Sequence, residues 1–86
     1  MPIRARIVTQ FEQVAKEQQR KLAPLRDDLK LVESGLDSLS YAVIVARLED
    51  ALGVDPFDAD DVSLPVTFGD FVGLYERQLA AVKAPG

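Results

Sequence analysis

The stretch Gly35-Leu36-Asp37-Ser38-Leu39 is the most informative part of this chain, because it marks the beginning of a helix. Asp37 is a good N-cap residue, since its carboxylate can accept a hydrogen bond from an unpaired backbone N–H of the first helical turn. Gly35 suits a left-handed or tight backbone position just before the cap. The stretch therefore predicts a helix that begins at Ser38.

The same helix has a second start signal and a clear end. Leu36 and Tyr41 occupy the two positions of a hydrophobic staple around the cap. Gly53 suits the C′ position that commonly ends a helix. We therefore expect the helix to run from Ser38 to about Leu52.

Apolar residues at helical spacing indicate two further helices. Pro2 fits a first-turn position, and the first helix is expected over about residues 2–20 or 2–21. Thr67, three residues before Asp70, resembles a capping box and begins the last helix. The stripes are Ile3, Ile7, Val8, Phe11, Val14, Ala15 and Leu22 in the first helix, and Phe68, Phe71, Val72, Tyr75, Leu79 and Val82 in the last.

The connection between the first two helices is long. Pro24 ends the first pattern, and residues 25–36 show no sustained period. Such a connection is unusual unless it packs its own side chains, so we expect an ordered loop across the bundle. The side chains available for that packing are Leu25, Leu29, Leu31, Val32 and Leu36.

A short helical turn is expected at residues 58–62, between Pro56 and Pro65. The fold class is then all-α, a four-helix bundle of three main helices and a short third one. Eighty-six residues, 48% of them hydrophobic, suffice for one domain over residues 1–86. Its core covers about residues 3–82, and 83–86 form a frayed tail.

The composition excludes much catalytic chemistry. The chain has no cysteine and no histidine, so disulfides, thiolate nucleophiles, Ser-His pairs and cysteine or histidine zinc sites are absent. Glu49 and Asp50 are adjacent on one helix and do not face each other as an acid/base pair would. We expect no enzyme and no catalytic residue.

Charge is divided unevenly. Residues 1–30 hold seven Lys and Arg against four Asp and Glu, whereas residues 31–86 hold three against ten. The acidic half favours a partner with a basic docking surface and disfavours nucleic acid, although a solvated face serving solubility explains it equally well. No apolar run approaches the roughly 20 residues that span a bilayer. We expect a cytoplasmic monomer that binds neither nucleic acid nor membrane.

An acidic cluster near residue 58 invites comparison with a calcium loop. Its members are Asp55, Asp58, Asp60 and Asp61. Counted from Asp58, the sixth position is Ser63 rather than glycine, and the twelfth is Gly69 rather than glutamate. We predict no metal site.

Ser38 is the main candidate for a functional residue. A phosphate ester on its Oγ would lie near free N–H groups and the positive end of the helix dipole. An early-helix serine without any special role is also common. The local chemistry leaves both interpretations open.

The stretch 35–39 resembles the attachment motif of acyl and peptidyl carrier proteins, small four-helix bundles that carry 4′-phosphopantetheine on the serine of Asp-Ser-Leu. The order of helices and the long loop extend the likeness over roughly residues 3–82. The resemblance implies that Ser38 accepts the group from coenzyme A through a separate phosphopantetheinyl transferase, framed by Asp37 and Leu39. Ser34 and Ser40 do not match the motif position.

By the same resemblance, the arm's thiol would hold an acyl, aminoacyl or peptidyl thioester. A loading ligase and a downstream synthase or transferase would be the other partners. The alternative is an unmodified helical interaction module with the same fold.

The helix after Ser38 departs from carriers of bacterial fatty acid synthesis, which resemble one another in displaying acidic residues there. Here no acid occurs after Ser38 until Glu49. An apolar patch would dock by shape and burial, which favours a specialised peptide, polyketide or acyl pathway. The candidate docking residues are Leu36, Val43, Ala46 and Arg47, with a core position as the alternative for Val43.

Overall fold

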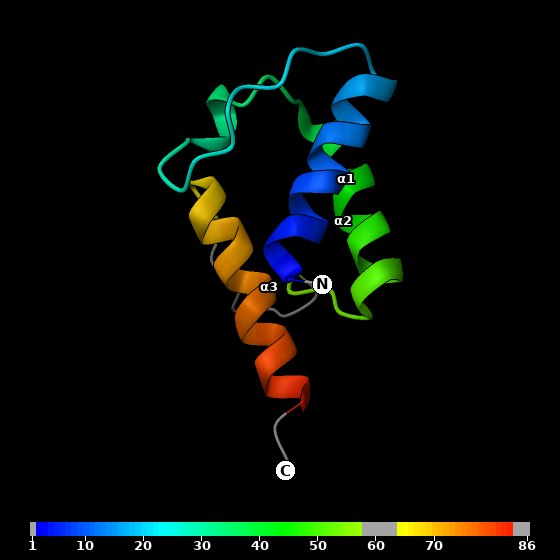
Figure 1. Ribbon diagram of the computed structural model, residues 1–86, viewed down its shortest axis with the longest axis vertical. Coiled ribbons are helices and arrows are strands. Elements are labelled where there is room, and N and C mark those ends of the chain that lie inside the picture. Colours follow the sequence, from blue (N-terminus) through cyan, green and yellow to red (C-terminus); the bar gives the residue numbers. More distant parts are fainter. Residues whose placement is uncertain (1, 58–63, 84–86) are drawn as a thin grey trace.

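Three α-helices, one short 3-10 helix and a long loop make up the described part of the chain (Figure 1). The computed structural model describes residues 2–57 and 64–83. Helix α1 spans Ile3–Glu17, η1 spans Leu31–Glu33, α2 spans Ser38–Leu52 and α3 spans Phe68–Lys83. These two segments contain no strand, which confirms the all-α class. The short helix predicted at residues 58–62 lies outside the described residues.

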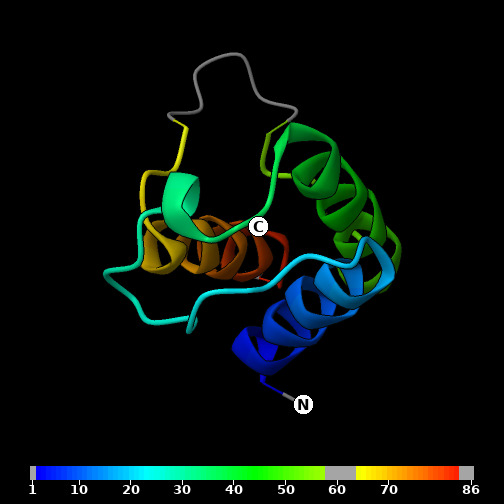
Figure 2. The same ribbon diagram turned by 90° about the horizontal axis from the view of Figure 1, so that it is seen from above.

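Helix α1 is the central element of the bundle. It packs against both α2 and α3, and it runs in the opposite direction to both (Figure 1). The loop between α1 and α2 crosses one end of the bundle, where α1 ends and the other two helices begin (Figure 2). This arrangement confirms the predicted loop and places Ser38 at the loop end of the molecule.

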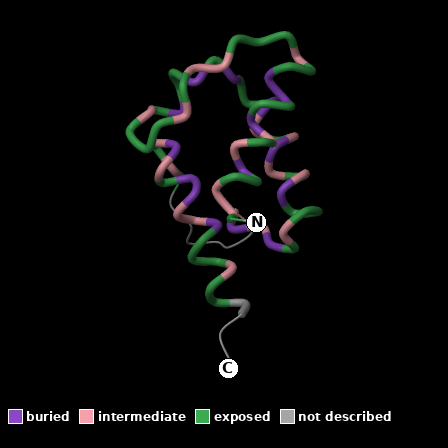
Figure 3. Tube along the Cα trace, viewed as in Figure 1, coloured by how far each residue is buried: buried purple, intermediate pink, exposed green. Residues whose placement is uncertain are grey.

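Buried positions recur along all three helices (Figure 3), and aromatic rings fill much of the core between them. The Phe11 side chain of α1 is fully buried and meets three other rings edge-on. Its ring centroid lies 5.8 Å from that of Tyr41 on α2, and 5.2 and 5.3 Å from those of Phe68 and Phe71 on α3. One ring thus joins all three helices. The predicted stripe residues Ile7, Val14, Ala15, Val72 and Tyr75 are also buried.

Helix α1 ends at Glu17, earlier than the predicted residue 20 or 21. Gln19 adopts a left-handed backbone with φ of 55°, and its N–H donates to the Lys16 carbonyl at 3.1 Å. The Arg20 N–H donates to the Ala15 carbonyl at 2.8 Å. These two bonds form a Schellman motif, in which the left-handed residue is usually glycine. With glutamine there, the sequence carries no stop signal.

The loop packs its own side chains, as predicted, but not all of them. Leu31 and Leu36 are buried, and Leu25 and Leu29 lie half-buried against the core. Val32 is 89% exposed, so its predicted packing is wrong. Leu31 and Val32 are neighbours in the one-turn helix η1, and only one of them can face the core.

The loop also completes the start of α3. The N–H groups of Phe68 and Gly69 donate to the Leu29 and Asp27 carbonyls of the loop at 2.8 and 3.0 Å. Thr67 and Asp70 form the predicted capping box: the Asp70 N–H donates to Thr67 Oγ1, and the Thr67 N–H donates to Asp70 Oδ2. The first N–H groups of α3 are therefore all paired within the protein.

Across residues 2–57 and 64–83, no helix is both long enough and apolar enough to span a bilayer.

Candidate functional site

Three serines lie close together in the sequence around the start of α2, and only one of them is exposed. Ser34 and Ser40 are fully buried, whereas Ser38 is exposed at the first helical position. The Ser34 hydroxyl donates to the Leu31 carbonyl at 2.7 Å. The Ser40 hydroxyl bonds Asp37 and Gln18. Ser38 is therefore the serine that a large external reagent can reach.

A hydrogen-bonded cluster of Tyr41, Ser34 and the Leu31 carbonyl holds the start of α2 in place. The Tyr41 hydroxyl of α2 donates to the Leu31 carbonyl at 2.9 Å and lies 2.5 Å from Ser34 Oγ. Burial raises the pKa of the Tyr41 phenol, so the phenol keeps its proton near neutral pH. The cluster joins α2 to η1. Tyr41 thus stabilises the helix start through its hydroxyl, in addition to any contact in the predicted staple with Leu36.

Asp37 is the N-cap of α2, as predicted. Its Oδ1 accepts hydrogen bonds from the Ser40 N–H and the Ser40 hydroxyl, both at 2.9 Å. Its Oδ2 lies 2.6 Å from Nη2 of Arg20, a residue that follows the end of α1. One carboxylate therefore connects the ends of two helices directly beside Ser38.

The start of α2 differs from the start of α3 in its unpaired donors. The first two N–H groups of a helix have no acceptor within it, and in α3 the loop supplies carbonyls for both. At α2, the Ser38 and Leu39 N–H groups have no acceptor among the described residues. Free N–H groups at a helix N-terminus favour an anion. The start of α2 therefore suits a phosphate ester on Ser38.

Asp37 makes the stability of this site depend on pH. The bonds from the Ser40 N–H and hydroxyl, and then the Arg20 guanidinium, hold the pKa of Asp37 below its ordinary value of 3.8. A lowered folded pKa means that the charged carboxylate contributes its full stability above the unfolded pKa, and that this contribution is lost as pH falls through the folded pKa.

We expect the melting temperature of the wild type to fall more steeply below about pH 3.8 than that of Asp37→Asn, which still caps the helix but has no charge to lose. Circular dichroism melts from neutral to acidic pH measure the difference. A difference between the two proteins that stays constant with pH would contradict the role of the Asp37 charge.

The predicted docking residues differ in their exposure. Ala46 is exposed, as expected for the outer side of α2. Leu36 is only 8% exposed, and Val43 is half-buried against the core, between the exposed side and the core position that the sequence left open for it. Val43 lies three residues after Ser40 and one before Ile44, both of which are buried, so it sits at the edge of the buried side of α2.

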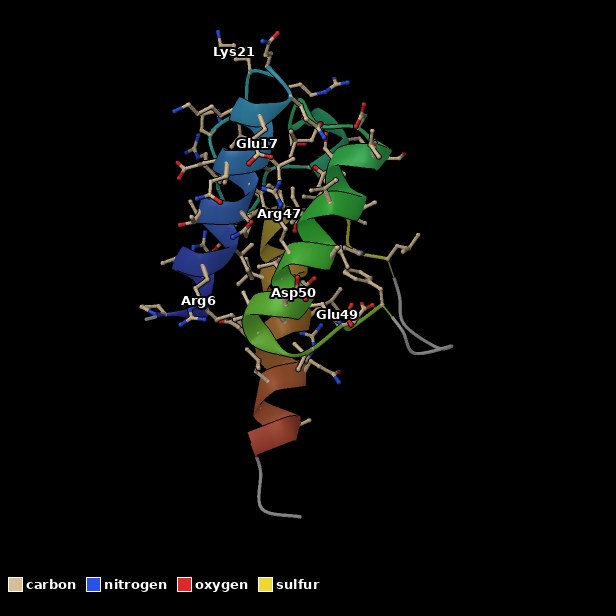
Figure 4. The ribbon with its side chains drawn as sticks, turned by 90° about the vertical axis from the view of Figure 1, so that its right-hand side faces the viewer. Arg6, Glu17, Lys21, Arg47, Glu49 and Asp50 are labelled. Atoms are coloured by element: carbon tan, nitrogen blue, oxygen red, sulfur yellow. The ribbon has the colours of Figure 1, made fainter. Side chains whose placement is uncertain are left out.

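Arg47 is held within the molecule. Its guanidinium makes two bonds to the Glu17 carboxylate of α1, at 2.6 and 3.0 Å (Figure 4). This bidentate pair lowers the pKa of Glu17, chiefly through the hydrogen bonds from Arg47. A docking partner would therefore meet a paired Arg47 rather than a lone cation.

The structure also exposes apolar side chains that the sequence did not single out as docking residues. Leu39, predicted to frame Ser38, is 67% exposed. Val32, Leu64 and Val66 are 89%, 80% and 62% exposed. The Leu31 N–H donates to the Val66 carbonyl at 2.9 Å, which sets Val66 beside η1. The apolar surface near the loop end thus comes from Leu39, η1 and the segment before α3.

Metal binding finds no support in the described residues. Within residues 2–57 and 64–83, no three side chains of the metal-ligating types gather. Three of the four aspartates compared with a calcium loop, Asp58, Asp60 and Asp61, lie outside the described residues.

Sequence reasoning missed Arg20 and Gln18 as parts of this site. Arg20 is 17 positions from Asp37, and Gln18 is 22 positions from Ser40. No sequence pattern predicts pairs that are so far apart, because both contacts depend on the path of the chain after the Schellman turn at the end of α1.

Comparison with known proteins agrees with this geometry. A family model described as "Phosphopantetheine attachment site" matches residues 5–67, which is most of the chain and includes Ser38. No curated protein and no solved structure matched the chain. The start of α2 offers an exposed serine with free N–H groups, and these features fit the group that the family carries. The chain belongs to the phosphopantetheine attachment-site family, the acyl and peptidyl carrier proteins, whose prosthetic group is 4′-phosphopantetheine.

Proposed function

We propose that Ser38 is the attachment residue and that the protein carries an acyl, aminoacyl or peptidyl group for partner enzymes. The observation that carries this proposal is the contrast among the three serines: Ser34 and Ser40 are buried and hydrogen-bonded, and Ser38 is exposed. A phosphopantetheinyl transferase would join Ser38 Oγ to the phosphate of coenzyme A, with loss of the adenosine bisphosphate portion and of the hydroxyl proton.

The residues around Ser38 support this reaction without performing it. The Ser38 and Leu39 N–H groups face no acceptor in the described residues, and Asp37 and Tyr41 hold the helix start in place. The arm, once attached, supplies a terminal thiol for thioester formation, which this cysteine-free chain lacks. Activation and transfer of the cargo belong to separate partners, a loading ligase and a downstream synthase or transferase.

Loading of Ser38 can be tested by intact mass. Incubation with coenzyme A and a broad-specificity phosphopantetheinyl transferase should add one phosphopantetheinyl group to the wild type and none to Ser38→Ala. Ser40→Ala, which removes a neighbouring hydroxyl of the same helix, is the matched control and should still be loaded. A wild type that gains no mass would leave the alternative, an unmodified interaction module.

We further propose that partners dock on an apolar surface, in a specialised pathway rather than in housekeeping fatty acid synthesis. The exposed Leu39, Val32 and Val66 support this proposal, as does the absence of acidic residues in α2 before Glu49. Docking through apolar burial responds weakly to salt, whereas docking through exposed charges is screened. Transfer rates from the loaded protein that fall steeply with added salt would count against apolar docking.

A further inference from the structure

The end of α1 contacts the start of α2 through a small group of side chains. Gln18 Oε1 accepts the hydroxyl of Ser40, and the Arg20 guanidinium lies 2.6 Å from Oδ2 of Asp37. The other oxygen of Asp37 accepts the Ser40 N–H. Arg20, a cation that follows the end of α1, is therefore held against the residue that precedes Ser38.

The backbone before Arg20 keeps that cation in place. Gln19 has a φ of 55°, a left-handed conformation that is unfavourable for a residue other than glycine. The Arg20 N–H is tied to the Ala15 carbonyl at 2.8 Å, so the turn is fixed on both sides of Gln19. Strained backbone of this kind persists where the surrounding structure over-determines it, often at functional sites. Here it directs Arg20 toward the cap of α2.

Attachment of a phosphodiester changes the charge balance at this point. Before attachment, Asp37 and Arg20 form one ion pair beside Ser38. Afterwards, two anions occupy one helix N-terminus, the Asp37 carboxylate and the phosphodiester. A guanidinium has five N–H donors, and the pair with Asp37 is made by Nη2. The pair with Asp37 therefore leaves further N–H donors on the Arg20 guanidinium.

We propose that Arg20 is a positioning residue for the prosthetic group: its guanidinium binds the phosphodiester on Ser38 together with the Asp37 carboxylate. This inference rests on the proposed role of Ser38. It gives the strained end of α1 a function, because Arg20 offsets the repulsion between the two anions. It also orients the base of the arm relative to α1.

The test compares the stability of the unloaded and fully loaded protein. In the wild type, loading should leave the melting temperature nearly unchanged. In Arg20→Gln, loading should lower the melting temperature by roughly 4 °C more than it does in the wild type. A change of 1 kcal/mol shifts the melting temperature of a domain of this size by about 4–8 °C. If the Arg20–Asp37 pair had only a structural role, Arg20→Gln would instead lower the melting temperatures of the unloaded and the loaded protein equally. Added salt should shrink the difference.

Lys21→Gln is the matched control, because it removes the same charge from the adjacent residue. The Lys21 side chain projects away from the bundle (Figure 4). Loading should change the melting temperature of Lys21→Gln as little as it changes that of the wild type. Arg20→Lys, which keeps the charge but not the planar fork, should show an intermediate effect. The ³¹P resonance of the loaded protein should shift in Arg20→Gln and not in Lys21→Gln.

Two failures can be told apart. If intact mass shows that the wild type is never loaded, the assignment of Ser38 fails. If loading is complete and Arg20→Gln responds to it as Lys21→Gln does, Ser38 stands and the role of Arg20 is overturned.

Discussion

Phe11→Ala is expected to remove about 3–5 kcal/mol from the free energy of unfolding, the usual cost of truncating a buried phenylalanine. The Phe11 side chain is fully buried and contacts Tyr41 from α2 and two phenylalanines from α3. Because α1 packs against both other helices, the cavity would weaken both interfaces at once. Domains are stable by about 0.05–0.15 kcal/mol per residue, so this loss is a large fraction of the total.

Urea unfolding followed by circular dichroism measures the loss. Val32→Ala is the matched control, since Val32 is 89% exposed and surface truncations usually stay within about 0.5 kcal/mol. A Phe11→Ala protein as stable as the control would show that the aromatic cluster does not hold the bundle together.

Tyr41 also donates a hydrogen bond to the Leu31 carbonyl near Ser38. We therefore expect Phe11→Ala to be loaded more slowly, because the cavity would displace Tyr41.

The parts of the fold that the sequence predicted well are those with local signals. Asp37 and Gly53 bound α2 at the predicted residues, and Gly53 adopts the expected left-handed backbone with φ of 76°. Thr67 and Asp70 mark the start of α3. In each case, the helix end is marked by a residue type that commonly occurs at helix ends, so it can be recognised in the sequence.

The parts that the sequence did not predict depend on tertiary contacts. The end of α1 was missed because Gln19, not glycine, takes the left-handed position. Arg20 was missed because its partner Asp37 is 17 residues away. The half-buried position of Val43 was not predicted, because a continuous apolar run does not say which side of α2 faces the core. The sequence singled out Ser38 as the candidate attachment residue from a local pattern, whereas Gln18 and Arg20 are brought to it by the packing of α1.

Gly35→Ala is expected to cost roughly 3 kcal/mol of stability, because it combines backbone strain with a steric clash. Gly35 has a φ of 96°, which a residue with a Cβ rarely adopts. A Cβ at Gly35 would also fall on the carbonyl oxygen of Lys21, far inside van der Waals contact. That carbonyl is backbone, so the chain itself has to move.

Gly53→Ala separates the two causes. Gly53 also has a positive φ, 76°, but a Cβ there would meet nothing within 4 Å. It should therefore show the strain alone, about 1–2 kcal/mol. Equal losses in the two variants, measured by urea unfolding, would mean that the contact with Lys21 costs nothing.

The clash at Gly35 should also disturb the proposed attachment site at Ser38. Lys21 follows Arg20 directly, and the Ala23 N–H donates to the Ser34 carbonyl at 2.9 Å, so residues 20–23 lie against the segment that leads into α2. Displacement of Lys21 would move Arg20 away from Asp37. We therefore expect Gly35→Ala to be loaded more slowly than Gly53→Ala, even where both are fully folded. Loading rates followed by intact mass decide this, and equal rates would show that the Arg20–Asp37 pair tolerates the shift.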